Sequence, residues 1–99
     1  MSVIMELSIF PLGSEESVSP YVARAAKIIE QSGLDYTIES MGTSIEGEWD
    51  QVLEVLDKCF KELSRDNHRI YLTVKADYRK DRRDGLKRKV ESVREKMGR

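Results

Sequence analysis

The chain has 99 residues, of which 39% are hydrophobic and 35% are charged, and its net charge is −1 at pH 7. This length fits one domain, and no apolar run approaches the roughly 20 residues that cross a bilayer. The N-terminus has no signal-peptide pattern, and the one cysteine, Cys59, has no second cysteine with which to form a disulfide. We therefore expect a cytoplasmic protein with no membrane partner.

The small net charge hides an asymmetry along the chain. Residues 1–78 carry 7 basic and 14 acidic residues, a net charge of −7, whereas residues 79–99 carry 10 basic and 4 acidic residues, a net charge of +6. A basic tail of this kind binds nucleic acid in some proteins, and in others it pairs with the acidic body or with a neighbouring subunit. We favour internal compensation and do not expect a nucleic-acid partner.

Periodicity divides the chain into strands and helices. Alternation of period two predicts strands over residues 3–10, 35–41, 43–48 and 69–78. Helical spacing predicts three helices, over residues 19–32, 49–63 and 86–97, the first with Ser19 as N-cap, Pro20 at its first position and Gly33 after its end. A loop over residues 12–18 joins the first strand to the first helix.

The order of these elements is β-α-β-β-α-β followed by one more helix. This order predicts an α+β fold, a ferredoxin-like βαββαβ sandwich with an additional C-terminal helix. We expect residues 1–80 to form the domain. Residues 81–99 would form a basic helix that packs on this domain or on a neighbouring subunit.

A glycine-bracketed stretch, Met41 to Asp50, carries two carboxylates before the second helix. In a strand, Ile45 would face one side of the sheet and Ser44, Glu46 and Glu48 the other. Such a polar row suits a groove for a small cation or amine, although it is also typical of a solvated strand face.

The sheet face that the two helices leave uncovered is expected to mix polar and apolar side chains. This mixture favours self-association into a homodimer or, preferably, a homotetramer. The residues expected on this face are Ile4, Glu6, Ser8, Phe10, Thr37, Glu39, Met41, Ser44, Glu46, Tyr71, Thr73 and Lys75.

Catalytic chemistry finds little support in the sequence. His68 stands in a predicted turn without a partner motif, and Cys59 lies in a helical apolar stripe. Ser17 and Ser19 could bind a phosphate at the start of the first helix, although capping is the simpler reading of Ser19. We expect no catalytic residue, no metal site and no enzyme activity.

Several segments together resemble one family. Pro11-Leu12-Gly13, residues 17–24, Ser32-Gly33-Leu34 and the Met41–Asp50 block have the order and spacing found in the small single-domain thiamine-binding proteins, which are related to the tandem-domain hydroxymethylpyrimidine/thiamine-binding protein. The resemblance spans about residues 3–80, with the C-terminal helix as the less typical part. It implies a ferredoxin-like dimer or tetramer that binds a ligand without turnover.

Thiamine joins a cationic thiazolium to an aminopyrimidine, so its recognition requires carboxylates, hydroxyls and an apolar or aromatic wall. We expect thiamine, or its pyrimidine moiety, as a bound ligand and not as a cofactor of catalysis. The alternatives are an oligomeric structural or regulatory module without such a ligand, and an RNA-binding domain that uses the basic helix. The candidate ligand-binding residues are Ser8, Ser17, Ser19, Glu39, Met41, Thr43, Ser44, Glu46 and Glu48, with Glu46 ranked first.

Overall fold

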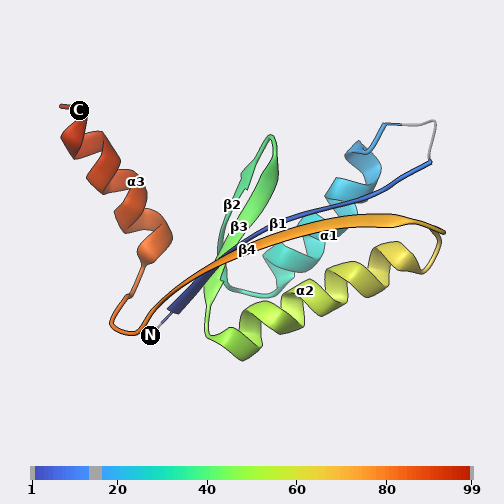
Figure 1. Ribbon diagram of the computed structural model, residues 1–99, viewed down its shortest axis with the longest axis horizontal. Coiled ribbons are helices and arrows are strands. Elements are labelled where there is room, and N and C mark those ends of the chain that lie inside the picture. Colours follow the sequence, from blue (N-terminus) through green and yellow to red (C-terminus); the bar gives the residue numbers. More distant parts are fainter. Residues whose placement is uncertain (1, 14–16, 99) are drawn as a thin grey trace.

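Four antiparallel strands form one sheet in the order β2-β3-β1-β4, as the computed structural model shows for residues 2–13 and 17–98 (Figure 1). The strands are β1 (Ser2–Pro11), β2 (Asp35–Glu39), β3 (Gly42–Gly47) and β4 (Ile70–Arg79), and the helices are α1 (Ser19–Gln31), α2 (Trp49–Ser64) and α3 (Gly85–Lys96). The predicted ferredoxin-like α+β fold with an additional C-terminal helix is confirmed. Of the predicted loop over 12–18, residues 14–16 lie outside the described residues.

The core forms between the sheet and the two helices α1 and α2. Alternate residues of β1 point towards these helices, as the period-two pattern predicts, and meet apolar stripes of period 3.6. Removal of these side chains from water is the main stabilising contribution to the fold. The buried apolar residues of this cluster are Val3, Met5, Leu7, Ile9, Ala25, Ile29, Ile45, Val52, Val55, Cys59 and Leu63.

Two local predictions are wrong in detail. Val18, not Ser19, is the N-cap of α1, and the Ser17 hydroxyl accepts a hydrogen bond from the Ser19 amide at 3.2 Å. Met41 is not a strand residue, because β2 ends at Glu39 and a two-residue turn leads directly to Gly42. Both errors concern ends of elements, where local periodicity carries the least information.

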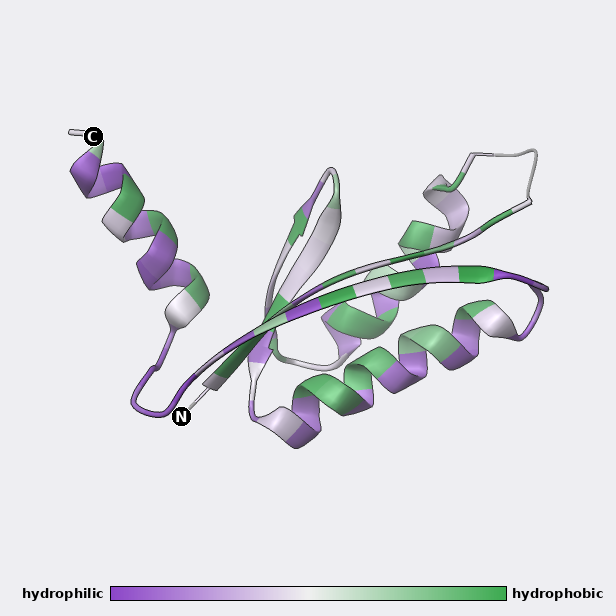
Figure 2. Ribbon diagram, in the orientation of Figure 1, coloured by the Kyte–Doolittle hydropathy of each residue, from purple (hydrophilic) through white to green (hydrophobic). Residues whose placement is uncertain are grey.

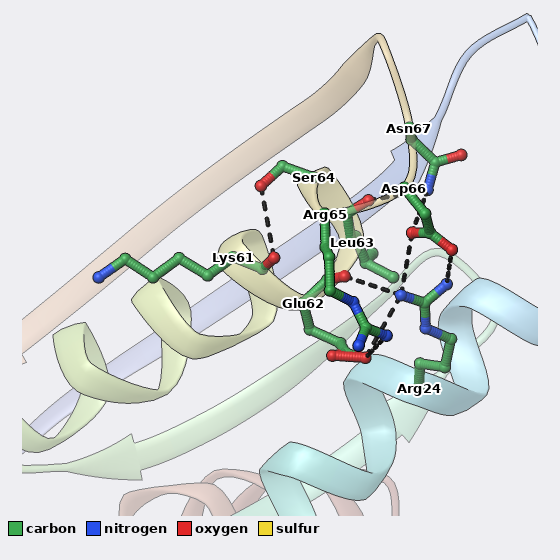
Figure 3. Close-up of polar contacts among 8 residues, drawn as sticks. All are labelled: Arg24, Lys61, Glu62, Leu63, Ser64, Arg65, Asp66 and Asn67. Atoms are coloured by element: carbon green, nitrogen blue, oxygen red, sulfur yellow. Dashed lines mark hydrogen bonds and ion pairs between the residues drawn. The ribbon is translucent and has the colours of Figure 1, made fainter.

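A cluster of charged side chains joins α1 to the C-terminal end of α2 (Figure 3). The Arg24 guanidinium donates to both carboxylate oxygens of Asp66, each at 3.0 Å, and to the main-chain oxygen of Glu62 at 2.7 Å. The Glu62 carboxylate accepts from Arg24 and also from Arg65. Because these bonds run between the two helices, they fix how α1 lies against α2.

We predict that Arg24→Gln lowers the free energy of unfolding by about 1–2 kcal/mol, because a two-pronged charged contact and a bond to a main-chain carbonyl are lost together. Chemical denaturation measures this change. Lys58→Gln is the matched control: Lys58 pairs with Glu54 on the surface of the same helix, and such pairs contribute about 0.3–0.5 kcal/mol. Equal losses of unfolding free energy in the two variants would contradict the proposed role of Arg24 in joining α1 to α2.

The third helix, α3, stands apart from α1 and α2 (Figure 1). Its first turn lies near β1 and β3, whereas Val90, Val93 and Met97 are about half exposed. Most of its residues are hydrophilic, with these apolar positions between them (Figure 2). None of the helices in the described ranges is long and apolar enough to cross a membrane.

Candidate ligand-binding site

A cavity of about 260 Å³ lies between α1 and the β2–β3 hairpin. Its wall is mostly apolar, and its polar groups come from β1 and from the hairpin turn. Pockets that combine an apolar wall with a few polar groups are the usual binding sites for small molecules. The lining residues are Leu7, Ser8, Ile9, Phe10, Val18, Val22, Ala25, Ala26, Ile29, Glu39, Ser40, Met41, Gly42 and Thr43.

The cavity exists because the two strands that flank β1 pair with different lengths of it. The β4 strand pairs with β1 along its whole length, as far as Pro11, but β3 pairs with β1 only from Val3 to Leu7. Beyond Leu7, the edge of β1 that faces the hairpin is therefore open. An open strand edge presents main-chain donors and acceptors, so residues 8–10 offer main-chain hydrogen-bonding groups at the cavity.

Small residues keep both sides of the cavity open. Ala25 and Ala26 on α1 leave room where longer side chains would fill the space between helix and sheet. At Gly42, an added Cβ would lie 3.0 Å from the Leu7 main-chain oxygen, so glycine allows the hairpin to lie close to β1. Two adjacent alanines on one helix are a signal in the sequence that could have indicated this cavity.

Four of the nine predicted site residues meet at this cavity: Ser8, Glu39, Met41 and Thr43. Met41 is 85% exposed in the turn, and Thr43 is buried. Ser17 and Ser19 do not line the cavity, but Val18 between them does. The structure therefore brings four of the predicted site residues to one cavity, which residues 8–10 of β1 and Val18 also line.

The other three predicted residues, Ser44, Glu46 and Glu48, lie elsewhere. Ser44 is on the outer face of the sheet, opposite Glu6. Glu48 is the N-cap of α2, and its main-chain amide donates to the Gln51 side chain at 2.9 Å. The alternation that places Ser44 and Glu46 on one face is confirmed by the register, but neither residue lines the cavity.

Glu46 holds the start of α3. Its two carboxylate oxygens accept hydrogen bonds from the main-chain amides of Gly85, at 2.8 Å, and Leu86, at 3.1 Å. These amides have no partner within the helix, and a carboxylate at this end also meets the favourable end of the helix dipole. Asp84, which would normally cap the helix, provides no side-chain bond to it. A residue 39 positions away in the sequence performs this function instead.

Arg82 and Ser2 complete the anchor around Glu46. The Ser2 hydroxyl donates to Glu46 at 2.8 Å and accepts from Arg82 Nε at 2.9 Å. Arg82 Nη1 also donates to Asp77 Oδ2 at 3.0 Å. A Cβ on Gly85 would lie 2.4 Å from Arg82 Cδ, so glycine is required where the helix crosses the arginine. Sequence reasoning missed this network, because its members come from four separate segments.

The hydrogen bonds determine the charge state of Glu46. Burial alone raises the pKa of the carboxyl group, but the bonds from Leu86, Ser2 and Gly85 and the charge of Arg82 outweigh burial and hold its pKa below the usual 4.5. The carboxylate is therefore ionised at neutral pH. Because its pKa is lowered in the folded state, its contribution to stability is present above pH 4.5 and is lost as the pH falls through the lowered value.

We predict that Glu46→Gln detaches the start of α3. The carboxamide has an NH2 group in place of one carboxylate oxygen, so one main-chain amide would face a donor and lose its acceptor. The loss should be roughly 1.5–3 kcal/mol for this buried charged group, seen as faster hydrogen exchange at Gly85 and Leu86. Acidification below pH 4.5 should produce the same local loss of helix in the wild type by circular dichroism. Glu91→Gln, the same charge change within α3, is the control, and equal exchange in both variants would contradict the anchor.

Cys59 and His68, the cysteine and the histidine of the chain, lie in different surroundings. Burial raises the pKa of the Cys59 thiol to about 11, so it is not a thiolate at neutral pH. His68 is exposed in the loop before β4. Within the described ranges, no three metal-ligating side chains come together.

A sequence profile described as thiamine-binding protein matches residues 5–94. The chain belongs to the thiamine-binding protein family. The match continues through most of α3, so the expectation that the resemblance ends near residue 80 is wrong, and the anchored helix lies within the matched region.

Related proteins have nearly the same length as this chain. It is 33% identical over 93 residues to the UPF0045 protein MJ1052 of Methanocaldococcus jannaschii, covering 94% of this chain and 93% of that protein. It is 38% identical over 98 residues to a UPF0045 protein of Methanothermobacter thermautotrophicus, covering 96% and 99%.

Solved structures agree with the fold. The crystal structure of the Methanocaldococcus jannaschii protein has a TM-score of 0.85 at 33% identity and covers 93% of this chain and 95% of that one. A candidate thiamine biosynthesis or salvage protein of Thermotoga maritima has a TM-score of 0.83 at 19% identity, covering 94% and 99%. The second comparison supports the fold alone.

Proposed function

We propose that this protein binds thiamine, or its hydroxymethylpyrimidine moiety, without catalysing a reaction, in the cavity between α1 and the β2–β3 hairpin. The observation that carries the proposal is that Glu39, two hydroxyl residues and an open strand edge lie around one apolar space. Membership of the thiamine-binding protein family supports the ligand class.

The chemistry of the cavity matches the ligand. The cationic thiazolium and the amino group of the pyrimidine favour a carboxylate, which Glu39 supplies at the hairpin turn. Ser8, Thr43 and the main chain of residues 8–10 supply hydrogen-bonding groups for ring nitrogens, and Ile9, Ala25 and Ile29 form the apolar wall. At about 260 Å³ the space is near the lower end of ligand pockets, roughly 300 Å³. One aromatic ring lies inside, and the rest of thiamine reaches the opening beside Met41.

We therefore propose Glu39, and not Glu46, as the carboxylate that contacts the ligand. Glu46 already accepts three hydrogen bonds, from Ser2, Gly85 and Leu86, and is buried under the start of α3. Glu39 is exposed beside the cavity, and among the described residues no hydrogen bond or ion pair of its side chain is found, so we propose that it is available to a ligand.

We predict that calorimetric titration detects binding of thiamine or hydroxymethylpyrimidine by the wild type. Glu39→Gln should weaken this binding roughly tenfold, because a charged acceptor is replaced by a neutral one. Glu30→Gln is the control, since Glu30 is exposed on α1 and does not line the cavity. Glu62 would be a poor control because it pairs with Arg24 and Arg65.

Two results would contradict the proposal. Failure of the folded wild type to bind either compound would reject the ligand class. Equal affinity of the wild type and Glu39→Gln would move the carboxylate contact elsewhere.

We also infer that the protein acts in the cytoplasm as a homo-oligomer, a dimer or a tetramer. Apolar side chains remain exposed on two surfaces, at Tyr71 on the outer face of β4 and at Val90, Val93 and Met97 on α3. Exposed apolar groups gathered on one surface favour association. A module that only assembles, without a ligand, would show the same surfaces, and the titration above distinguishes the two functions.

We predict that light scattering at micromolar concentration gives at least twice the chain mass of 11.4 kDa. Val93→Glu, placed within the exposed apolar row of α3, should reduce the mass by putting a charge into the contact. Glu91→Gln, on the same helix but outside this row, should leave the mass unchanged. A particle of 11.4 kDa for the wild type would reject the oligomer.

A further inference from the structure

A second concave surface lies on the basic end of the molecule. It has a volume of about 480 Å³ and lies between α3 and the segment that links β4 to it. It shares no residue with the cavity of the proposed ligand site. Its lining residues are Arg79, Lys80, Asp81, Arg82, Gly85, Arg88, Lys89 and Ser92.

This basic cleft, defined by those eight residues, has a surplus of positive charge. Five of its residues are cationic and one is acidic. Arg82 and Lys89 are balanced by Asp77, at 3.0 Å and 2.6 Å. In the part of the chain that the structure describes, no ion pair is found for the other three cations, which are Arg79, Lys80 and Arg88.

Part of the wall of the cleft is fixed by the same network that anchors α3. The Arg82 side chain is only 7% exposed and is bonded to Ser2 and Asp77. Gly85 leaves the space above Arg82 free of a side chain. A cleft with one fixed cationic wall, lined by three further cations for which the described residues show no ion pair, is suited to an anion, because these side chains gain an ion pair without losing one seen in those residues.

We propose that the basic cleft binds a small phosphate-bearing anion. A phosphate dianion would accept hydrogen bonds from the guanidinium groups of Arg79 and Arg88, which suit its geometry, and from the Ser92 hydroxyl. This assignment is independent of the proposed thiamine site.

The shape and charge pattern favour a small anion over nucleic acid. Asp81 lies in the cleft itself, and Asp77, Asp84, Glu91 and Glu95 alternate with the basic residues of β4, the linker and α3. An extended chain of phosphates would meet these carboxylates, whereas one phosphate group in the cleft meets mainly cations.

The test is titration of the full chain with two probes, inorganic phosphate and methyl phosphate. Binding is monitored by the NMR shifts of the α3 amides. Arg88→Gln should weaken binding of both probes roughly tenfold, as expected for one charged hydrogen-bonding partner. Arg94→Gln is the matched control, because Arg94 lies on the same helix but faces a different groove, beside Asp35 and Leu86. Its affinity should be unchanged.

Several outcomes would overturn the proposal. Absence of binding by the wild type at millimolar phosphate would do so, and so would equal weakening in Arg88→Gln and Arg94→Gln, which would indicate diffuse attraction to the whole helix. Tight binding of a single-stranded oligonucleotide with a steep salt dependence would assign the surface to nucleic acid instead.

A different result would support the proposal and identify the source of the anion. Preference for methyl phosphate over inorganic phosphate would indicate a phosphate monoester.

Discussion

One buried carboxylate determines how the C-terminal helix α3 is attached to the rest of the chain. Glu46 accepts from Ser2 at the start of β1 and from the first two amides of α3, and Arg82 lies within 3.8 Å of it. Burial of a charge is unfavourable unless every polar neighbour is satisfied. In the described part of the chain, no buried side-chain nitrogen or oxygen lacks a hydrogen-bond partner. The left-handed backbone of Asp84, with φ of 53°, turns the helix amides towards the carboxylate.

The segment from Met41 to Glu48, which contains β3, therefore has two structural roles. Its first residues, Met41, Gly42 and Thr43, line the cavity, and Glu46, three residues later, holds α3. The β3 strand is paired on both sides, with β2 and with β1. The cavity wall and the anchor of α3 thus share a structural element, and the close approach of Gly42 to β1 fixes where that element lies.

The sequence was sufficient for the fold and for part of the site. Period two in β1 identified the buried face with Val3 to Ile9, and the same alternation correctly put Ser44 and Glu46 on the opposite face. It could not show that α3 returns to cover Glu46, because that contact joins residues 39 positions apart and depends on backbone amides that carry no sequence signal. The cavity was hidden for a related reason: it results from strand pairing that stops at Leu7. Residues such as Ala25 and Ile29, read as core, also form its wall.

The most direct test of the account is the location of bound thiamine by NMR shift mapping on the wild-type protein. The account predicts the largest shifts at the amides of residues 8–10, Ala25 and Thr43, around the cavity, with smaller changes at Gly85 and Leu86. Shifts confined to Ser44, Glu46 and the first turn of α3 would contradict it, because the ligand would then occupy the outer face of the sheet.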